Sequence, residues 1–239
     1  MDVCVSRQEG INMGFNVAID GPAGAGKSTI AKLAAKKLNL IYVDTGAMYR
    51  AMALFMLREG VNPQDTEAVE RKCREVDITI GYEPGENESR EQVVYLNGEN
   101  VNAYLRTEAV GNMASVVSAQ PAVRRKLVEL QQRLAEDKDC IMDGRDIGTC
   151  VLPGAQVKVY LTADSRVRAK RRFDELFRKG QTCDLDRVQA DIEERDYRDM
   201  HREASPLTQA EDAVVLDTSE MTIEEAAAEL MRLCRERRN

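Results

Sequence analysis

The sequence of 239 residues is 43% hydrophobic and 31% charged, proportions that are ordinary for a globular protein with a sizeable core. Its formal net charge of −7 argues against general binding to nucleic acid or to anionic membrane surfaces. No apolar stretch approaches the roughly 18 residues of a membrane-spanning helix, and the six cysteines form no C-x-x-C pair, so we expect a cytoplasmic protein with reduced thiols.

The first part of the chain begins without hydrophobic periodicity and then alternates strand and helix patterns. We expect residues 1–13 to be a disordered extension. After them, the pattern predicts a buried strand at 15–20, a helix at 27–38, a second strand at 40–43 and a helix at about 47–58. Strands that alternate with helices in this way predict a parallel sheet.

One segment interrupts this alternation. Three of its stretches have extended patterns: "VDITIGY" at 76–82, "QVVYLNG" at 92–98 and "ENVNAYL" at 99–105. Asn97-Gly98 is a strong signal for a type I′ hairpin turn. We therefore predict a small antiparallel β insertion at 71–105, within a core domain made of residues 14–70 and 106–239.

The remainder of the chain returns to helices and parallel strands. The predicted elements are helices near 107–118 and 121–136, strands at 140–142, 157–161 and 213–216, a long charged helix after the second of these strands, and a closing helix with Ser219 or Thr222 as its N-cap. Together with the first part, they predict an α/β fold with a doubly wound parallel sheet.

The stretch "GPAGAGKST" at 21–29 lies between the first predicted strand and helix, a context in which G-x-x-x-x-G-K-[ST] is typical of a phosphate-binding loop. Its glycines let backbone N–H groups surround a phosphate, Lys27 can reach the β- and γ-phosphates, and the Ser28 hydroxyl can ligate Mg²⁺. An incidental glycine-rich turn is the alternative interpretation. We predict that the loop binds a nucleoside triphosphate through Gly21, Pro22, Ala23, Gly24, Ala25, Gly26, Lys27, Ser28 and Thr29.

Other motifs bear on the acceptor of the phosphate. The sequence has no N-K-x-D motif for reading guanine, and its best candidate for a Walker-B strand is the short "CIMD" at 140–143, which argues against a GTPase and a motor ATPase. "DTGAMYR" at 44–50 places Arg50 where a guanidinium can hold an acceptor phosphate. An exposed helix arginine is the alternative. We favour a kinase of a small phosphorylated acceptor.

Two further motifs concentrate charged residues after predicted strands. "DGRDIGT" at 143–149 supplies Asp143 for a metal ion and Arg145 for a ligand. The second motif, "ERDYRDMHR" at 194–202, contains three charged residues at the spacing i, i+4 and i+7, which places them on one face of a helix. These residues are Arg195, Asp199 and Arg202. A solvated ladder of salt bridges is the alternative interpretation of this face.

In this order, "GPAGAGKST", "DTGAMYR", "NMASVVSAQPAVR", "DGRDIGT" and "RDYRDMHR" resemble the motifs of the bacterial cytidylate kinases. The resemblance covers residues 15 to about 235 and includes the antiparallel insertion, which in that family belongs to the monophosphate-binding region. It implies the fold of P-loop nucleoside monophosphate kinases. It also implies ATP-dependent phosphorylation of CMP and dCMP to CDP and dCDP, with Mg²⁺ as cofactor.

The resemblance further implies roles for individual residues. Those that would bind CMP are Thr45, Tyr49, Arg50, Ser115, Arg124, Arg145, Asp146, Arg195, Asp199 and Arg202. A short lid at about 166–185 would begin with the basic run "RVRAKRRF", from which Arg168 would bind ATP. The catalytic residues would be Lys27, Arg145 and Arg172. The metal ligands would be Ser28 and Asp143, with Asp143 acting through water. A solvated basic face is the alternative interpretation of the lid run.

Cytosine selection has a physical explanation in such a site. The N4 amino group of cytosine donates a hydrogen bond and its N3 accepts one, whereas uracil reverses both. A buried carboxylate opposite N4 therefore favours CMP over UMP. We assign this role to Asp146, together with Arg124.

Other functions remain possible on these residues. A kinase of another small acceptor, such as UMP, AMP or shikimate, would share the phosphate loop. A non-catalytic nucleotide-binding switch would bind the nucleotide without transferring phosphate. We expect a monomer that binds ATP and CMP or dCMP, but neither nucleic acid nor membranes.

Overall fold

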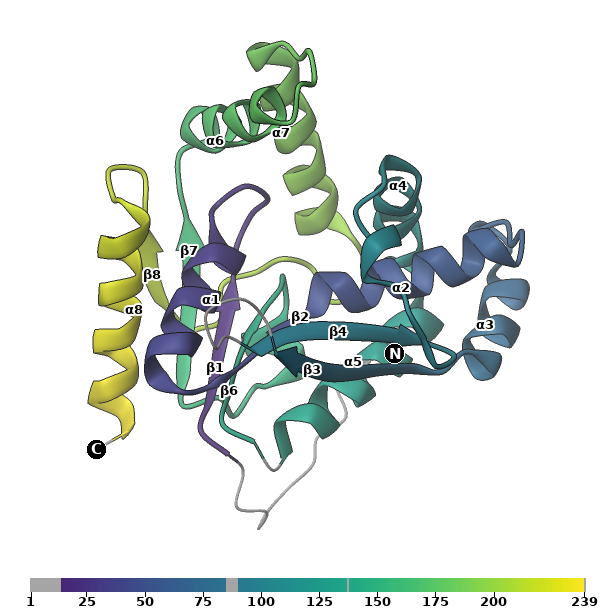
Figure 1. Ribbon diagram of the computed structural model, residues 1–239, viewed down its shortest axis with the longest axis horizontal. Helices are drawn as coiled ribbons and strands as arrows, with labels where there is room; N and C mark the ends of the chain where they lie inside the picture. The colour runs from purple at the N-terminus through teal and green to yellow at the C-terminus, as the bar shows by residue number, and fades with distance from the viewer. Residues whose placement is uncertain (1–13, 85–89, 137, 239) are drawn as a thin grey trace. The chain divides into compact units, whose positions relative to one another are not determined.

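The computed structural model describes residues 14–84, 90–136 and 138–238 (Figure 1). The predicted disordered extension at 1–13 lies outside the described residues. Two compact units are formed: the phosphate-loop unit, within residues 13–42 and 138–239, and the insertion unit, within residues 43–137. The predicted antiparallel insertion at 71–105 is only part of the second unit.

A five-stranded sheet organises the phosphate-loop unit. Its order is β2-β6-β1-β7-β8, and β1 pairs in parallel with both β6 and β7. The strands span Asn16–Asp20 (β1), Ile41–Asp44 (β2), Cys140–Asp143 (β6), Val157–Thr162 (β7) and Val214–Asp217 (β8). Every residue of β1 is buried, because a central parallel strand is covered on both faces. The predicted parallel sheet is confirmed, and each strand lies within one residue of its predicted bounds.

The helices of this unit are α1 (Lys27–Leu38), α6 (Ser165–Arg178), α7 (Leu185–His201) and α8 (Ile223–Arg238). The predicted long charged helix after β7 is confirmed as α6. It ends in a turn through Gly180, whose φ is 74°, and α7 starts after this turn. α8 begins with a reciprocal cap. The Glu225 N–H donates to Thr222 Oγ1 at 3.2 Å, and the Thr222 N–H donates to Glu225 Oε2 at 2.8 Å. Thr222, and not Ser219, is therefore the N-cap.

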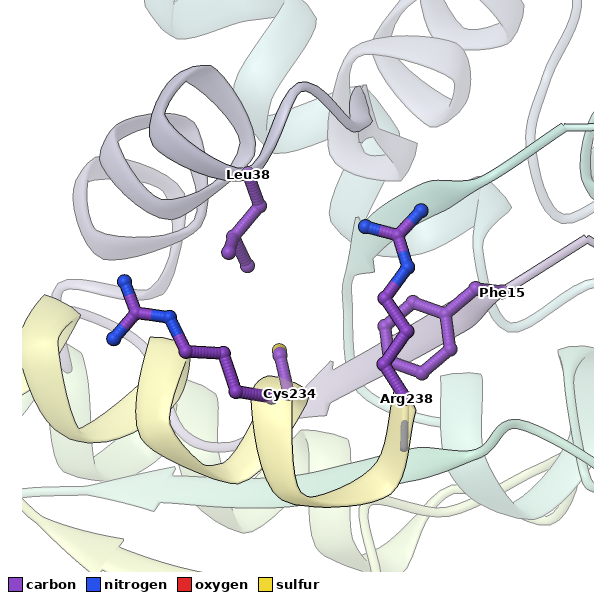
Figure 2. Close-up of a pocket in the computed structure, with 5 residues that line it drawn as sticks. Phe15, Leu38, Cys234 and Arg238 are labelled. Carbon is purple, nitrogen blue, oxygen red and sulfur yellow. The ribbon is translucent and has the colours of Figure 1, made fainter.

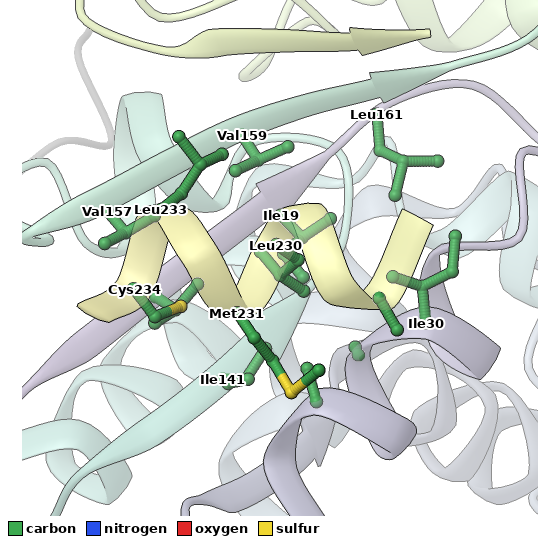
Figure 3. Close-up of a cluster of buried hydrophobic side chains, with 14 of the residues drawn as sticks. Ile19, Ile30, Ile141, Val157, Val159, Leu161, Leu230, Met231, Leu233 and Cys234 are labelled. Carbon is green, nitrogen blue, oxygen red and sulfur yellow. The ribbon is translucent and has the colours of Figure 1, made fainter. Parts of the chain in front are cut away.

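Helices α1 and α8 pack against each other and against one face of the sheet. Leu230, Leu233 and Cys234 of α8 belong to the same buried cluster as the strand residues Ile19, Val157 and Val159 (Figure 3). Residues four apart share a helix face, and burying each leucine contributes about 2 kcal/mol. Because the phosphate loop runs from β1 into α1, this core fixes both ends of the loop.

The insertion unit contains a small antiparallel sheet with order β3-β4-β5. Its strands span Ile78–Pro84 (β3), Arg90–Leu96 (β4) and Glu99–Asn100 (β5). Asn97 and Gly98 have φ values of 50° and 84°, both positive as a type I′ turn requires. The antiparallel insertion is confirmed. Its third strand is shorter than predicted, because a 3₁₀ helix occupies Asn102–Tyr104.

The helices of the insertion unit are α2 (Thr45–Arg58), α3 (Thr66–Glu75), α4 (Glu108–Val117) and α5 (Pro121–Glu136). The sequence pattern does not predict α3, in which only Val69 and Cys73 are buried. Both α4 and α5 pack against α2. Among the described helices of the two units, none combines the length and the apolar composition that crossing a membrane requires.

Candidate active site

The phosphate loop connects β1 to α1 in the phosphate-loop unit. Gly21 has a φ of 146°, and a Cβ atom there would lie 2.0 Å from the carbonyl oxygen of Leu161, so only glycine fits. Gly26 directly precedes α1, and no side chain of the described residues caps the helix at this position. The first N–H groups of α1 are therefore available to an anion, which the helix dipole also favours.

Lys27 is the first residue of α1 and is only 6% exposed. Its Nζ donates hydrogen bonds to the carbonyl oxygens of Gly21 and Pro22, each at 2.7 Å. Burial, together with the nearby guanidinium of Arg145, lowers the pKa of Lys27 well below its ordinary value. A phosphate beside the ammonium group would raise this pKa again, so phosphate binding and protonation of Lys27 favour each other.

Asp143, at the end of β6, accepts hydrogen bonds from two hydroxyl groups. Its Oδ2 accepts from Ser28 Oγ at 2.7 Å, and its Oδ1 accepts from Tyr42 Oη at 2.8 Å. The serine hydroxyl and the carboxylate are hard oxygen ligands of the kind that Mg²⁺ prefers. Within the described residues, no group of three or more His, Cys, Asp or Glu could hold a metal ion. The pair therefore suits an ion that takes its other ligands from water and phosphate.

Asp20 is a site residue that the motifs do not reveal. It ends β1, and its two carboxylate oxygens accept hydrogen bonds from the N–H groups of Ile147 and Gly148, both at 2.7 Å. These residues begin a turn of π-helix at Ile147–Val151. Asp20 therefore fixes the backbone of the "DGRDIGT" motif. Its only signal in the sequence is a carboxylate at the end of a buried strand, immediately before the phosphate loop.

Burial raises the pKa of Asp20 to about 6, although its two backbone hydrogen bonds act in the opposite direction. Since folding favours the protonated form, the stability that this group contributes is fully present below about pH 4 and is lost as the pH rises through about 6. We expect the free energy of unfolding of the wild type, minus that of Asp20→Asn, to fall by roughly 2–3 kcal/mol between pH 4 and pH 7.

Urea unfolding at several pH values measures this difference. Asp191→Asn, at an exposed position of α7, serves as the control and should show no such trend. A wild-type-minus-Asp20→Asn difference that stays constant with pH would contradict the prediction.

Two ion pairs connect the "DGRDIGT" motif to the end of α7. Arg145 Nε donates to Asp199 Oδ2 at 2.8 Å, and Arg202 Nη2 donates to Asp146 Oδ1 at 3.4 Å. Arg202 Nη1 also lies 4.0 Å from Asp199 Oδ1. Burial raises the pKa of Asp199, but the charges of Arg145, Arg195 and Arg202 outweigh burial, so its pKa lies below the ordinary value. The structure thus brings four of the predicted residues into one network of alternating charge.

Other residues of this unit that the sequence predicts to contact a ligand have a different position or different partners in the structure. Arg202 follows the last residue of α7, so the prediction that it shares a helical face with Arg195 is wrong. Arg195 and Arg172 are exposed, and Arg172 pairs with a glutamate of its own helix at 2.8 Å. Arg168 is only 7% exposed, and its Nε and Nη1 atoms donate to protein groups.

In the insertion unit, the predicted acceptor residues lie on α2 and on the two helices that pack against it. α2 carries Thr45, Tyr49 and Arg50, α4 carries Ser115, and α5 carries Arg124. Arg124 is 1% exposed, and its guanidinium lies 5.6 Å from the centre of the Tyr49 ring. Thr45 is also buried, whereas Tyr49, Arg50 and Ser115 are half-buried. The structure therefore brings Arg124 and Tyr49 together.

The start of α2 is held by Gln92 of β4, which the motifs also do not reveal. Gln92 Oε1 accepts from the Asp44 N–H at 2.7 Å, and its Nε2 donates to the Asp44 carbonyl at 3.3 Å. The Asp44 side chain in turn caps α2 by accepting from the Ala47 N–H at 2.9 Å. A Cβ atom on Gly46 would lie 3.6 Å from Arg50 Nη2, so the arginine folds back over the first turn. The insertion thus supports the "DTGAMYR" motif.

A hollow of about 420 Å³ lies at the other end of β1 and α1 (Figure 2). It is lined by Phe15, Leu38, Cys234, Arg235 and Arg238. Phe15 precedes β1 and Leu38 ends α1, whereas the phosphate loop follows β1, so roughly 16–18 Å of helix separates the two places. Arg238 lies over the Phe15 ring and pairs with Asp139. The hollow is therefore separate from the phosphate loop.

The described cysteines are free thiols. Cys183, in the turn between α6 and α7, is partly exposed, and the others are buried: Cys73, Cys140, Cys150 and Cys234. Burial raises the pKa of Cys140 to about 12, and it raises the pKa values of Cys73 and Cys234 to about 11. These three thiols therefore stay protonated at neutral pH.

Comparison with known proteins identifies the family. A profile of the cytidylate kinase family matches residues 17–236. The cytidylate kinase of Ligilactobacillus salivarius (strain UCC118) is 48% identical over 223 residues, which cover 93% of this chain and 97% of that protein. The cytidylate kinase of Caldicellulosiruptor saccharolyticus is 49% identical over 219 residues, which cover 92% and 95%.

A crystal structure of an uncharacterized protein from Eubacterium ventriosum is similar in fold. Its TM-score is 0.50 at 12% sequence identity, and the match covers 93% of this chain and 98% of that chain. This similarity supports the α/β fold alone. The family is shown by the profile match and by the sequence identities, which extend over nearly the whole chain. The chain therefore belongs to the cytidylate kinase family.

Proposed function

We propose that this protein is a cytidylate kinase that transfers the γ-phosphoryl group of ATP to CMP and dCMP, giving CDP and dCDP. The observation that carries the proposal is the phosphate loop, in which the buried Lys27 lies beside the hydrogen-bonded Ser28 and Asp143. The loop supports a nucleoside triphosphate as donor, and family membership supports the acceptor. The protein would act as a cytoplasmic monomer, without nucleic acid or membrane partners.

On the donor side, the N–H groups of residues 21–29 would surround the phosphates of ATP. The Lys27 ammonium would exchange the carbonyl oxygens of Gly21 and Pro22 for phosphate oxygens. Ser28 and Asp143 fit Mg²⁺, with Asp143 acting through water. When bound, Mg²⁺ would neutralise part of the phosphate charge.

On the acceptor side, we assign the phosphate of CMP to Thr45, Tyr49 and Arg50. A guanidinium can bind two phosphate oxygens at once, and that of Arg50 lies over the first turn of α2. Ser115 and Arg124 are assigned to the base and sugar. The cation–π contact between Arg124 and Tyr49 supports these assignments, because it brings two of the assigned side chains together before any ligand binds.

The network of alternating charge would contact the rest of CMP. Asp146 is 5% exposed, and we assign it to the N4 amino group of cytosine, while Arg202 holds it in place. Arg195 and Asp199 are assigned to the pentose. A buried carboxylate that meets the uracil carbonyl instead of an amino group would lose roughly 1–3 kcal/mol of binding.

Transfer itself requires no protein nucleophile. An oxygen of the CMP phosphate would attack the γ-phosphorus of ATP, the bond to the β,γ-bridging oxygen would break, and ADP would leave. The protein contributes position and positive charge in such reactions. We assign these cations to Lys27, Arg145 and Arg172, of which Arg172 would act from the lid at 166–185.

The decisive experiment is a coupled assay of ADP release with the purified protein, ATP and Mg²⁺, run against CMP, dCMP, UMP, AMP and shikimate in turn. We expect CMP and dCMP to give the highest kcat/KM values. Faster turnover of UMP, AMP or shikimate would replace the proposed acceptor. ATP binding without any acceptor-dependent ADP release would instead indicate a nucleotide switch. Lys27→Ala, assayed in parallel, controls for contaminating kinases.

A further inference from the structure

One residue of the phosphate loop, Ala23, has its backbone N–H and its carbonyl oxygen both hydrogen-bonded to a buried ion pair. The N–H of Ala23 donates to Asp196 Oδ1 at 2.8 Å, and the carbonyl oxygen of Ala23 accepts from Arg168 Nη1 at 2.8 Å. The same Nη1 of Arg168 pairs with Asp196 Oδ2 at 2.5 Å. Both side chains are 8% exposed. We call these two residues the Ala23 clamp.

The Ala23 clamp comes from the two helices that follow β7. Arg168 lies in the first turn of α6, and Asp196 lies near the end of α7. Arg168 Nε also donates to the carbonyl of Ala163, before α6 begins, at 2.8 Å. The guanidinium is therefore fixed by backbone groups of two segments, and both oxygens of Asp196 are occupied.

Gly24, the next residue of the phosphate loop, also lies against α6 and α7. A Cβ atom on Gly24 would lie 3.3 Å from Arg168 Cβ and 3.6 Å from Ile192 Cδ1. Ile192 belongs to the small apolar cluster that joins α6 to α7, with Val188 and Ala169. The loop is thus in contact with the helix pair through both backbone hydrogen bonds and apolar packing.

A buried ion pair is a weak source of stability, because removing two charges from water costs about as much as their attraction returns. Its geometry is the more informative feature. The clamp satisfies the N–H and the carbonyl oxygen of Ala23, which belong to the two peptide groups on either side of its Cα atom, and Ala23 lies four residues before Lys27. Rotation of either peptide group about the Ala23 backbone would alter the direction of the N–H groups that follow it in the loop.

We propose that Arg168 and Asp196 are positioning residues, which set the orientation of the two peptide groups that flank the Ala23 Cα atom and so hold the phosphate loop in the form that binds ATP. This role replaces direct ATP binding by Arg168, the expectation from the sequence. The inference rests on the proposed function only in taking ATP as the ligand of the loop.

The test separates positioning from stability with a double variant. Arg168→Met and Asp196→Leu, made singly, each leave one buried charge without its partner and should lower the melting temperature. The double variant removes both charges and should recover most of that loss. We nevertheless expect its KM for ATP to be at least 10-fold above the wild-type value, with the KM for CMP changed less than 2-fold.

The two single variants also separate positioning from direct contact. If the clamp acts as a unit, Arg168→Met and Asp196→Leu raise the KM for ATP to a similar extent, and the double variant adds little. If Arg168 contacts ATP directly, Arg168→Met has a much larger effect than Asp196→Leu. That result would overturn the proposal, as would a double variant with the wild-type KM for ATP.

The matched control is an exposed ion pair that joins the same two helices. Arg166 of α6 pairs with Asp186 of α7, and their side chains are 52% and 80% exposed. Arg166→Gln combined with Asp186→Asn should leave both KM values unchanged. If the double clamp variant does not fold, Arg168→Lys replaces it, because an ammonium retains the charge opposite Asp196 but lacks the guanidinium fork. A severalfold rise in KM for ATP is then expected, and an unchanged value counts against positioning.

Calorimetric binding of a non-hydrolysable ATP analogue gives a readout that does not depend on the acceptor. If the wild type binds the analogue but phosphorylates neither CMP nor dCMP, the proposed function fails and the Kd values still test the clamp. If the enzyme turns over CMP and the clamp variants bind the analogue as tightly as the wild type, the clamp proposal alone fails.

Discussion

Lys27→Ala is expected to abolish phosphoryl transfer, with kcat lowered at least roughly 10³-fold, while the protein stays folded. The Nζ atom of Lys27 is enclosed by the loop and lies 2.7 Å from two carbonyl oxygens, so no other ammonium group can take its position. Its removal also relieves the cost of burying a charge, which offsets the loss of these two hydrogen bonds.

The measurement is kcat with saturating ATP and CMP, together with the melting temperature. Lys37→Ala, an exposed position on the same helix, is the matched control and should behave as the wild type in both. Near-normal turnover by Lys27→Ala would contradict the assignment of the phosphate loop. A collapse of the melting temperature would show that Lys27 has a structural role.

Asp146→Asn is expected to narrow the preference for CMP over UMP by roughly 5- to 100-fold. An asparagine can turn its amide N–H toward the C4 carbonyl of uracil, whereas a carboxylate cannot donate a hydrogen bond. Arg202 lies 3.4 Å from Asp146 and would keep an oxygen acceptor in the variant. We therefore expect the loss of kcat/KM to be larger for CMP than for UMP.

The quantity to compare is the ratio of kcat/KM for CMP to that for UMP, in the wild type and in the variant. Asp199→Asn is the control, because it disturbs the same network through Arg145 but is assigned to the pentose, which both substrates share. It should lower both activities together. If Asp146→Asn also leaves the ratio unchanged, Asp146 does not read the base, and recognition would be reassigned to Ser115, Arg124 and Arg202.

The sheet could be predicted from the sequence because each buried parallel strand is a short apolar run next to a helical pattern. α3 could not, since only Val69 and Cys73 of its ten residues are buried, which are too few apolar positions to define a helix in the sequence. The error after β5 has a related cause. Val101 and Leu105 are both buried, so the sequence pattern predicts a strand there, whereas a short 3₁₀ helix lies between them.

In the candidate site, too, some features could be predicted from the sequence and others could not. The phosphate loop is a local motif, so nine adjacent residues predict it. The partners of Arg168 are 145 and 28 residues away in the sequence, and those of Asp20 are 127 and 128 residues away. A motif can therefore identify a charged residue as part of the site, but it does not reveal whether that residue contacts a ligand or supports the backbone.

The exposure of Cys183 has a practical consequence for observing the enzyme at work. Thiolate is the species that reacts with maleimide dyes, and burial disfavours it at Cys73, Cys140 and Cys234. Cys183 lies in the turn between α6 and α7, where it packs against the apolar cluster of Ala169, Val188 and Ile192. With Cys4 replaced by serine, a single fluorophore at Cys183 would report whether the surroundings of that turn change when a nucleotide binds.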